Sequence, residues 1–146
     1  CCASGAKSVG SSDEVVKRMH QFGEYVGIAF QIKDDLFDYE KNHDTGKPNG
    51  IDIKEKKMTL PLIYTLNNSG WLEKRKAINI VRNHNNEPER VAELIQRVNA
   101  GKGIEYATQK MKEYQEKAFE LLNTFPDSPS RKSLEQLVIF TTERKH

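Results

Sequence analysis

Apolar side chains recur at steps of three and four residues along most of the chain, and this spacing predicts α-helices. The first long stripe consists of Val15, Met19, Phe22, Val26 and Ala29. Ser11 and Glu14 stand three residues apart just before this stripe, which predicts a capping box and a helix that begins there. From Ile28 onward further apolar residues widen the stripe almost around the helix. The helix is therefore predicted to be long and central, and to end near Glu40.

The rest of the chain has the pattern of one helix after another. Turn-forming residues separate the apolar stripes at 41–50, at Gly70, near Pro88, at 101–103 and at 126–130. Between these breaks Thr59 is predicted to cap one helix, Trp71–Asn83 to form the next, and Ser130 to cap the last. No segment shows the alternation of apolar and polar residues that is typical of a strand, and the sequence has no internal repeat. The pattern therefore predicts a single all-α domain over residues 1–146.

Composition and charge exclude several classes of protein. The chain has 146 residues, with 23 Lys and Arg against 21 Asp and Glu, and its formal charge of +2 gives no reason to expect a nucleic-acid surface. The two cysteines are adjacent and form no spaced metal or disulfide framework, which suits a reducing compartment, so a cytoplasmic location is expected. No apolar run approaches the roughly 20 residues of a membrane span, and the first residues lack signal-peptide character.

One polar strip interrupts the apolar helix that begins near Ser11. Gln31 lies three residues before Asp34 and four before Asp35, and Asp38 follows these aspartates at the same spacings. On a helix such residues share one face, so the three carboxylates repel one another. Each unpaired contact costs a few tenths of a kcal/mol on an exposed helix, and more where the dielectric is low. A cation is therefore expected beside them.

Three arrangements would offset the repulsion within such a carboxylate cluster. The commonest is a solvated face with salt bridges, here to Lys33, Lys41 or the lysines of 54–57. Calcium in an EF-hand is a poor fit because the following loop lacks the required ligand spacing. Magnesium takes one or two carboxylates and completes its octahedron with water and phosphate oxygens. Lys47 and Lys57 follow the aspartates and can contact a phosphate, although each alone is more often a solvated side chain.

The whole stretch FQIKDDLFDYEKNHDTGKPNGIDIKEKKMTLPLIYTL resembles the second aspartate-rich region of trans-type polyprenyl diphosphate synthases. An FQxxDDxxD helix, a GKxxGxD loop and a KxTLP helix start occur in the same order as in that family. The amino-acid sequence of the stretch is most similar to the octaprenyl type. The resemblance implies the C-terminal half of the isoprenoid synthase bundle, with about six to seven helices around a cavity. It implies an enzyme that condenses an allylic diphosphate with isopentenyl diphosphate.

The resemblance also implies roles for individual residues. Asp34 and Asp35 would bind Mg²⁺ that bridges to the allylic diphosphate, and Asp38 would complete the metal cluster. Gln31 would position the allyl group or its diphosphate. Lys47 and Lys57 would hold the departing diphosphate, which acquires negative charge as the C–O bond ionises. Apolar neighbours of the strip would exclude water from the allylic cation, although ordinary core packing is the commoner role for such residues.

The chain departs from the family pattern in two respects. No second paired-aspartate motif occurs in the 146 residues, whereas family members carry two and run to roughly 300 residues. The chain begins with CCASGAKS, which has no Met and no helix cap, so a fragment of a longer protein is expected.

Because the chain carries only half of the metal site, we expect that it does not catalyse the condensation by itself. Uncovered apolar stripes predict a homodimer or a higher oligomer. A non-catalytic regulatory subunit is the main alternative, and a terpene cyclase is a weaker one because DDLFD stands where cyclases carry an NSE-type triad.

Overall fold

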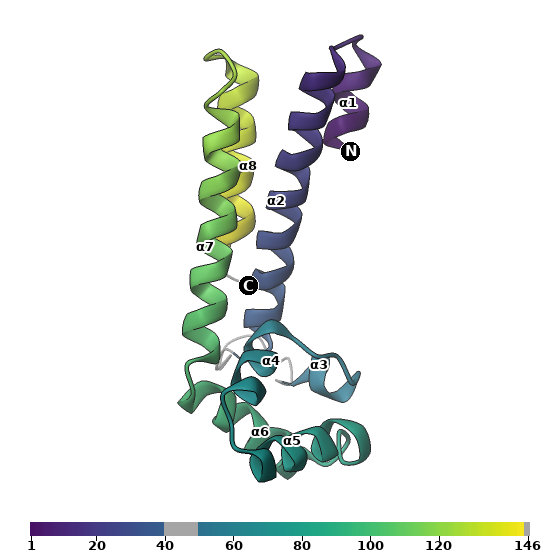
Figure 1. Cartoon of the computed structure of the whole chain (residues 1–146), viewed down its shortest axis with the longest axis vertical. Helices are drawn as coiled ribbons and strands as arrows, with labels where there is room; N and C mark the ends of the chain where they lie inside the picture. Colours follow the sequence, from purple (N-terminus) through teal and green to yellow (C-terminus); the bar gives the residue numbers. More distant parts are fainter. Residues whose placement is uncertain (40–49, 145–146) are drawn as a thin grey trace. The chain divides into compact units, whose positions relative to one another are not determined.

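The computed structural model describes residues 1–39 and 50–144, and these residues are helical with no strand (Figure 1). They form eight helices, α1 (Cys2–Ser8), α2 (Asp13–Phe37), α3 (Ile51–Lys54), α4 (Leu60–Asn67), α5 (Trp71–Asn83), α6 (Pro88–Ala100), α7 (Gly103–Leu122) and α8 (Pro129–Glu143). The prediction of an all-α fold is confirmed. The two helices that the apolar pattern did not mark separately are α1 and α3, which have seven and four residues.

The chain forms two compact units that share two of the helices. Unit 1 contains Cys1–Lys33 and Lys110–His146, and unit 2 contains Asp34–Gln109. The helices α2 and α7 each run from one unit into the other. None of the helices in the described parts of the chain is both long enough and apolar enough to cross a membrane. The single domain predicted over residues 1–146 stays a prediction.

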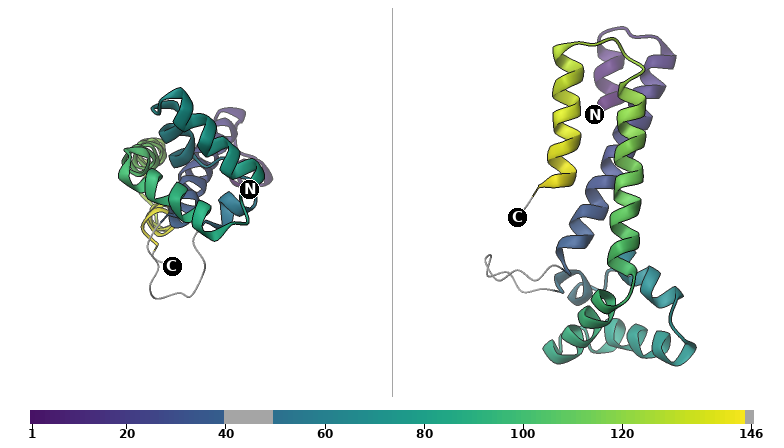
Figure 2. Two further views of the ribbon diagram at one scale, coloured as in Figure 1. Left: turned by 90° about the horizontal axis from the view of Figure 1, so that it is seen from below. Right: turned by 90° about the vertical axis from the view of Figure 1, so that its left-hand side faces the viewer.

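Unit 1 is built from α1, α8 and the unit 1 portions of α2 and α7 (Figures 1 and 2). Its core residues are Phe22, Ala118, Leu122 and Val138, all of them buried. The turn between α7 and α8 is tied to α2 by Arg18, whose Nη1 donates to Thr124 Oγ1 at 3.1 Å. The Arg18 guanidinium also lies 4.7 Å from the centre of the Phe125 ring. These contacts connect α2 with the turn that follows α7.

Two predicted helix caps are displaced along the sequence. The Oγ of Ser12, rather than that of Ser11, accepts the Val15 N–H at 3.4 Å, and α2 begins at Asp13. The last helix is capped by Ser128, whose Oγ accepts the Arg131 N–H at 3.1 Å, and not by Ser130. Proline at the first helical position explains the second shift, since its fixed φ suits the first turn and its missing N–H needs no partner there.

Unit 2 packs α4, α5 and α6 around one apolar core. Its buried members are Tyr39, Ile53, Leu62, Leu66, Ala77, Ile80, Val81, Val91, Leu94 and Val98. The start of α7 joins this core through Gly103, where an added Cβ would stand 2.5 Å from Thr65 Oγ1 and press on the Pro61 carbonyl oxygen. Gly103 therefore does more than end the preceding helix, because its missing side chain lets α7 approach the backbone of α4.

Candidate active site

The aspartates lie where α2 ends. Asp34 and Asp35 occupy its last turn and are half-buried, whereas Asp38 follows the last helical residue, Phe37. The helix was predicted to continue to about Glu40, so Asp38 does not extend the helical strip as expected. The reason is tertiary, because the Asp38 carbonyl oxygen accepts the N–H of Gly50 at 3.3 Å instead of continuing a helix.

Asp35 caps a helix that is distant in sequence. Its Oδ2 accepts the N–H of Leu60, the first residue of α4, at 3.1 Å. Thr59 occupies the predicted N-cap position, but its hydroxyl makes no cap bond. That hydroxyl instead shares a 2.5 Å hydrogen bond with the buried Tyr39 hydroxyl. The carboxylate of Asp35 therefore takes over the capping that the sequence assigned to Thr59.

Asp38 acts in the same way on α3. Its Oδ1 accepts the N–H of Ile51 at 2.7 Å, and its Oδ2 accepts the N–H of Asp52 at 3.2 Å. Gly50 precedes these donors with a left-handed backbone, at φ 81°, which glycine adopts without strain. Two of the three aspartates thus hold the N-termini of two helices, and α3 and α4 are drawn to the end of α2.

The surroundings of Asp38 disfavour its negative charge. Partial burial raises the pKa of this carboxyl above its ordinary value, and the nearby carboxylate of Asp52 raises it further. The backbone N–H donors of α3 act in the opposite direction and offset the rise only in part. Burial likewise raises the pKa of the Tyr39 hydroxyl well above its usual range. A bound cation would relieve the crowding of negative charge at this end of α2.

Lys57 lies between α3 and α4 and contacts two carboxylates. Its Nζ is 2.6 Å from Glu55 Oε2 and 3.1 Å from Asp52 Oδ1. Hydrogen bonds to Glu55 and Asp52 raise the pKa of the Lys57 ammonium, which therefore stays charged. Asp52 also donates its backbone N–H to Asp38, so a polar chain leads from the aspartate cluster to an exposed cation.

The remaining predicted residues divide between described and undescribed parts of the chain. Gln31 lies on α2, one turn before Asp34, and its side chain is exposed. Phe30 is also exposed, and its ring is covered by the guanidinium of Arg144 at 4.3 Å within unit 1. Lys47 lies outside the described residues. The predicted roles of Gln31, Lys47 and Lys57 toward a diphosphate stay predictions.

The sequence profile of one protein family, described as Polyprenyl synthetase, matches residues 1–98. The chain belongs to the polyprenyl synthetase family. Among its curated relatives, heptaprenyl diphosphate synthase component 2 of Bacillus subtilis is 32% identical over 145 residues, which are 99% of this chain and 40% of that protein. Octaprenyl diphosphate synthase of Escherichia coli is 32% identical over 136 residues, or 92% of this chain and 42% of that protein.

Solved structures of the polyprenyl synthetase family share the fold. The geranylgeranyl pyrophosphate synthase of Bacteroides thetaiotaomicron aligns with a TM-score of 0.90 at 38% identity, over 99% of this chain and 48% of that one. The geranylgeranyl pyrophosphate synthase of Corynebacterium glutamicum, complexed with calcium and isoprenyl diphosphate, aligns with a TM-score of 0.82 at 27% identity, over 97% and 44%. The chain spans less than half the length of each of these four relatives. The family resemblance and the isoprenoid synthase fold are thereby confirmed.

The donors at the end of α2 fit a hard cation. Carboxylate oxygens are ligands of Mg²⁺, which commonly takes one or two of them and fills its other positions with water and phosphate oxygens. Within residues 1–39 and 50–144, no group of three or more His, Cys, Asp or Glu side chains is arranged to hold a metal ion. Asp34 and Asp35 stay the predicted ligands of such an ion, and Asp38 stays the predicted third member of the cluster.

Sequence reasoning missed two residues in the surroundings of these aspartates, Asp52 and Tyr39. Asp52 repels Asp38 and pairs with Lys57, and its only signal was the GxD of the loop motif. Tyr39 bonds to Thr59 across 20 residues and joins the unit 2 core. No local pattern marks the Tyr39 contact, since an isolated tyrosine after a helix resembles any other core residue.

Replacing Asp38 by alanine is expected to lower the free energy of unfolding by about 0.5–2 kcal/mol, the usual cost of a lost helix cap. Both N–H donors at the start of α3 lose their acceptor in this variant. Asp38→Asn keeps one side-chain oxygen that accepts, so it can retain one of the two bonds and should cost less than Asp38→Ala. Urea titration followed by fluorescence of Trp71, which lies in the same unit, measures the difference.

The pH dependence of these Asp38 variants has a definite sign. Because the pKa of Asp38 is raised in the folded chain, folding favours the protonated carboxyl, and this contribution is lost as the pH rises through the raised pKa. Asparagine does not ionise. In metal-free buffer, the stability difference should therefore shift in favour of Asp38→Asn as the pH rises from acidic to neutral. An opposite shift contradicts the raised pKa of Asp38, whereas equal stability of the Ala and Asn variants contradicts the capping role.

Proposed function

We propose that this chain supplies one wall of the active site of a Mg²⁺-dependent trans-type polyprenyl diphosphate synthase. The reaction condenses isopentenyl diphosphate with an allylic diphosphate and yields a polyprenyl diphosphate. The observation that carries the proposal is the convergence of Asp35 and Asp38 with the starts of α3 and α4 at the end of α2, where Asp34 also lies. Membership of the polyprenyl synthetase family supports it.

The chain's own residues would act mainly on the leaving diphosphate. A bound Mg²⁺ would neutralise charge on the diphosphate as the allylic C–O bond breaks. Asp34 and Asp35 would hold the ion, and the position of Asp35 is fixed in part by the hydrogen bond that its carboxylate accepts from the Leu60 N–H at the start of α4. Lys57 is charged and exposed, so its ammonium can turn from Asp52 and Glu55 toward a phosphate oxygen. Loss of a proton after attack by the isopentenyl double bond completes the reaction.

The chain alone is expected to show no condensation of isopentenyl diphosphate with farnesyl diphosphate, because it carries one DDxxD motif and no second. A chimera tests the activity directly. This chain would replace the matching part of the Bacteroides thetaiotaomicron synthase, with which it aligns over 99% of its length. The chimera should condense both substrates in Mg²⁺, and chimeras with Asp34→Asn and Asp35→Asn should not.

The controls of the chimera experiment separate an enzyme from a regulatory subunit. Asp13→Asn and Asp127→Asn remove two exposed aspartates from unit 1 and should leave turnover unchanged. A folded chimera without turnover would favour the non-catalytic alternative. Turnover by the chain alone would overturn the half-site argument.

Self-association is expected from apolar side chains on α8. Leu137 and Phe140 are 49% and 67% exposed and lie three residues apart, so they share one face of the helix. Clustered exposed apolar groups of this kind commonly mark an interaction surface. Light scattering should show a dimer or a larger species, and Leu137→Gln with Phe140→Gln should shift it toward monomer. A monomeric wild type would contradict the expectation.

A further inference from the structure

The exposed face of α5 combines two large apolar side chains with a row of cations. Trp71 and Leu72 are 69% and 65% exposed at the start of the helix. The opposite face carries Ala77, Ile80 and Val81, which are buried in the unit 2 core. Arg75, Lys76 and Arg82 lie on the same exposed side as Trp71 and Leu72, by helical spacing and by their exposure. The helix is therefore amphipathic, and its outer face is itself divided into an apolar end and a basic stretch.

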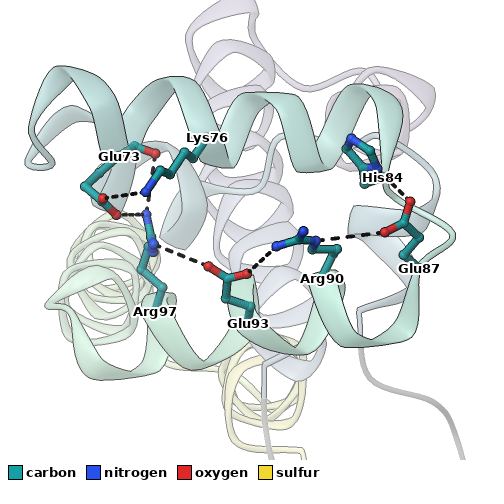
Figure 3. Close-up of polar contacts among 7 residues, drawn as sticks. All are labelled: Glu73, Lys76, His84, Glu87, Arg90, Glu93 and Arg97. Atoms are coloured by element: carbon teal, nitrogen blue, oxygen red, sulfur yellow. Dashed lines mark hydrogen bonds and ion pairs between the residues drawn. The ribbon is translucent and has the colours of Figure 1, made fainter.

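Most of the acidic groups near this face are already paired. Figure 3 shows a row of ion pairs between α5 and α6 in which Glu73 contacts Arg97 and, at 3.7 Å, Lys76. Glu93 in the same row pairs with Arg90 at 3.4 Å. Glu73 is the only acidic residue of α5, whereas the helix carries four cationic residues, Lys74, Arg75, Lys76 and Arg82. The face thus keeps a net positive charge.

The two arginines stand apart from that network. Within the described part of the chain, no ion pair involves Arg75 or Arg82. The Arg75 guanidinium lies 5.5 Å from the centre of the Trp71 ring, a cation–π contact that leaves its charge without an anionic partner. Between them lies an open hollow of about 600 Å³, lined by Leu72, Arg75, Lys76, Ile78, Asn79, Arg82 and Asn83. Its lining combines cations, amides and aliphatic groups.

We propose that this face of α5 binds the surface of an anionic phospholipid bilayer. Trp71 and Leu72 would enter the headgroup layer, where tryptophan is favoured, and Arg75, Lys76 and Arg82 would contact lipid phosphates. The hollow gives a phosphate headgroup a site whose lining includes the cations of Arg75, Lys76 and Arg82 and the aliphatic side chains of Leu72 and Ile78. The inference stands on unit 2 alone and is independent of the proposed prenyl transfer.

Charge and shape favour a bilayer over a nucleic acid. A nucleic acid would stack bases on an open aromatic face, but one face of the Trp71 ring is covered by Arg75. The exposed aliphatic side chain of Leu72 buries no apolar surface against a phosphate backbone, whereas it would be stabilised at the boundary between headgroups and acyl chains of a bilayer. The near-neutral charge of the chain as a whole gives no separate reason to expect a nucleic-acid surface.

The test uses the fact that Trp71 is the only tryptophan of the chain. Its emission should shift to the blue when vesicles of phosphatidylcholine with phosphatidylglycerol are added, and vesicles of pure phosphatidylcholine should cause little change. Arg75→Gln with Arg82→Gln should weaken binding about 30-fold, as expected when two cations near an anionic surface are lost. Added salt should weaken wild-type binding, since it screens exposed charges.

A matched variant gives the control for the charge effect. Lys17→Gln with Lys112→Gln removes two exposed cations from unit 1 and should bind as wild type. Leu72→Ser keeps the fluorophore and should reduce both the blue shift and co-sedimentation. Equal binding to neutral vesicles overturns the proposal, as does equal weakening in the unit 1 control. So does a shift caused by duplex DNA and not by anionic vesicles, and so does no shift at all.

Discussion

Gly103→Ala is expected to lower the free energy of unfolding by about 2–3 kcal/mol, at the upper end of the usual cost of overpacking. An added methyl group would stand 2.5 Å from Thr65 Oγ1 and against the carbonyl oxygen of Pro61. Neither atom can yield easily. Thr65 Oγ1 donates to that same carbonyl at 2.9 Å, and both residues are buried in α4. The strain would push apart the start of α7 and the helix that carries the Asp35 contact.

Gly27→Ala is the matched control for Gly103→Ala. Gly27 lies inside α2, and an added Cβ there would meet nothing within 4 Å. The same substitution should therefore stabilise the chain by about 0.5–1 kcal/mol, because alanine loses less backbone freedom than glycine in a helix. Urea denaturation followed by far-ultraviolet circular dichroism compares both variants with wild type. Changes of the same sign in both would contradict the close packing at Gly103.

Local sequence patterns predicted the helices of unit 2 well. The helix predicted over Trp71–Asn83 has those bounds, and the break predicted near Pro88 falls where α6 begins. Three local signals mark these helices, namely amphipathic spacing, proline in a first turn and glycine at a break. Each acts within a few residues, so each can be recognised from the sequence alone. The N-cap of α2 was predicted at Ser11 but lies at Ser12, because neighbouring serines offer the same hydroxyl group.

Local sequence patterns could not predict the hydrogen bonds of the aspartates at the end of α2. The motif drew attention to Asp35 and Asp38, but their hydrogen bonds reach residues 25 and 14 positions away, respectively, in Leu60 and Asp52. The sequence showed three charges on one helix, whereas the structure ends the helix before the third. Two of the charges cap other helices, so the same carboxylates carry a structural role and a proposed metal-binding role. Alanine variants of Asp35 or Asp38 would confuse the two roles.

Asparagine at positions 34 and 35 is therefore the decisive change, with an expected loss of Mg²⁺-dependent pyrophosphate binding of about 100-fold or more. The amide oxygen that Asp35→Asn introduces can still accept the Leu60 N–H, so the cap on α4 is retained. What disappears is the negative charge that holds the metal ion. Circular dichroism and urea denaturation should show a folded variant with stability close to wild type.

Isothermal titration calorimetry with inorganic pyrophosphate tests the metal-bridged site most directly. The wild-type chain should bind in Mg²⁺ and lose that binding in a chelating buffer, and Asp34→Asn with Asp35→Asn should not bind in either. The control, Asp13→Asn with Asp127→Asn, removes the same number of carboxylates from exposed positions of unit 1 and should bind as wild type. Binding that survives chelation, or that persists in the folded Asp34 and Asp35 variant, would contradict a divalent cation held by these two aspartates.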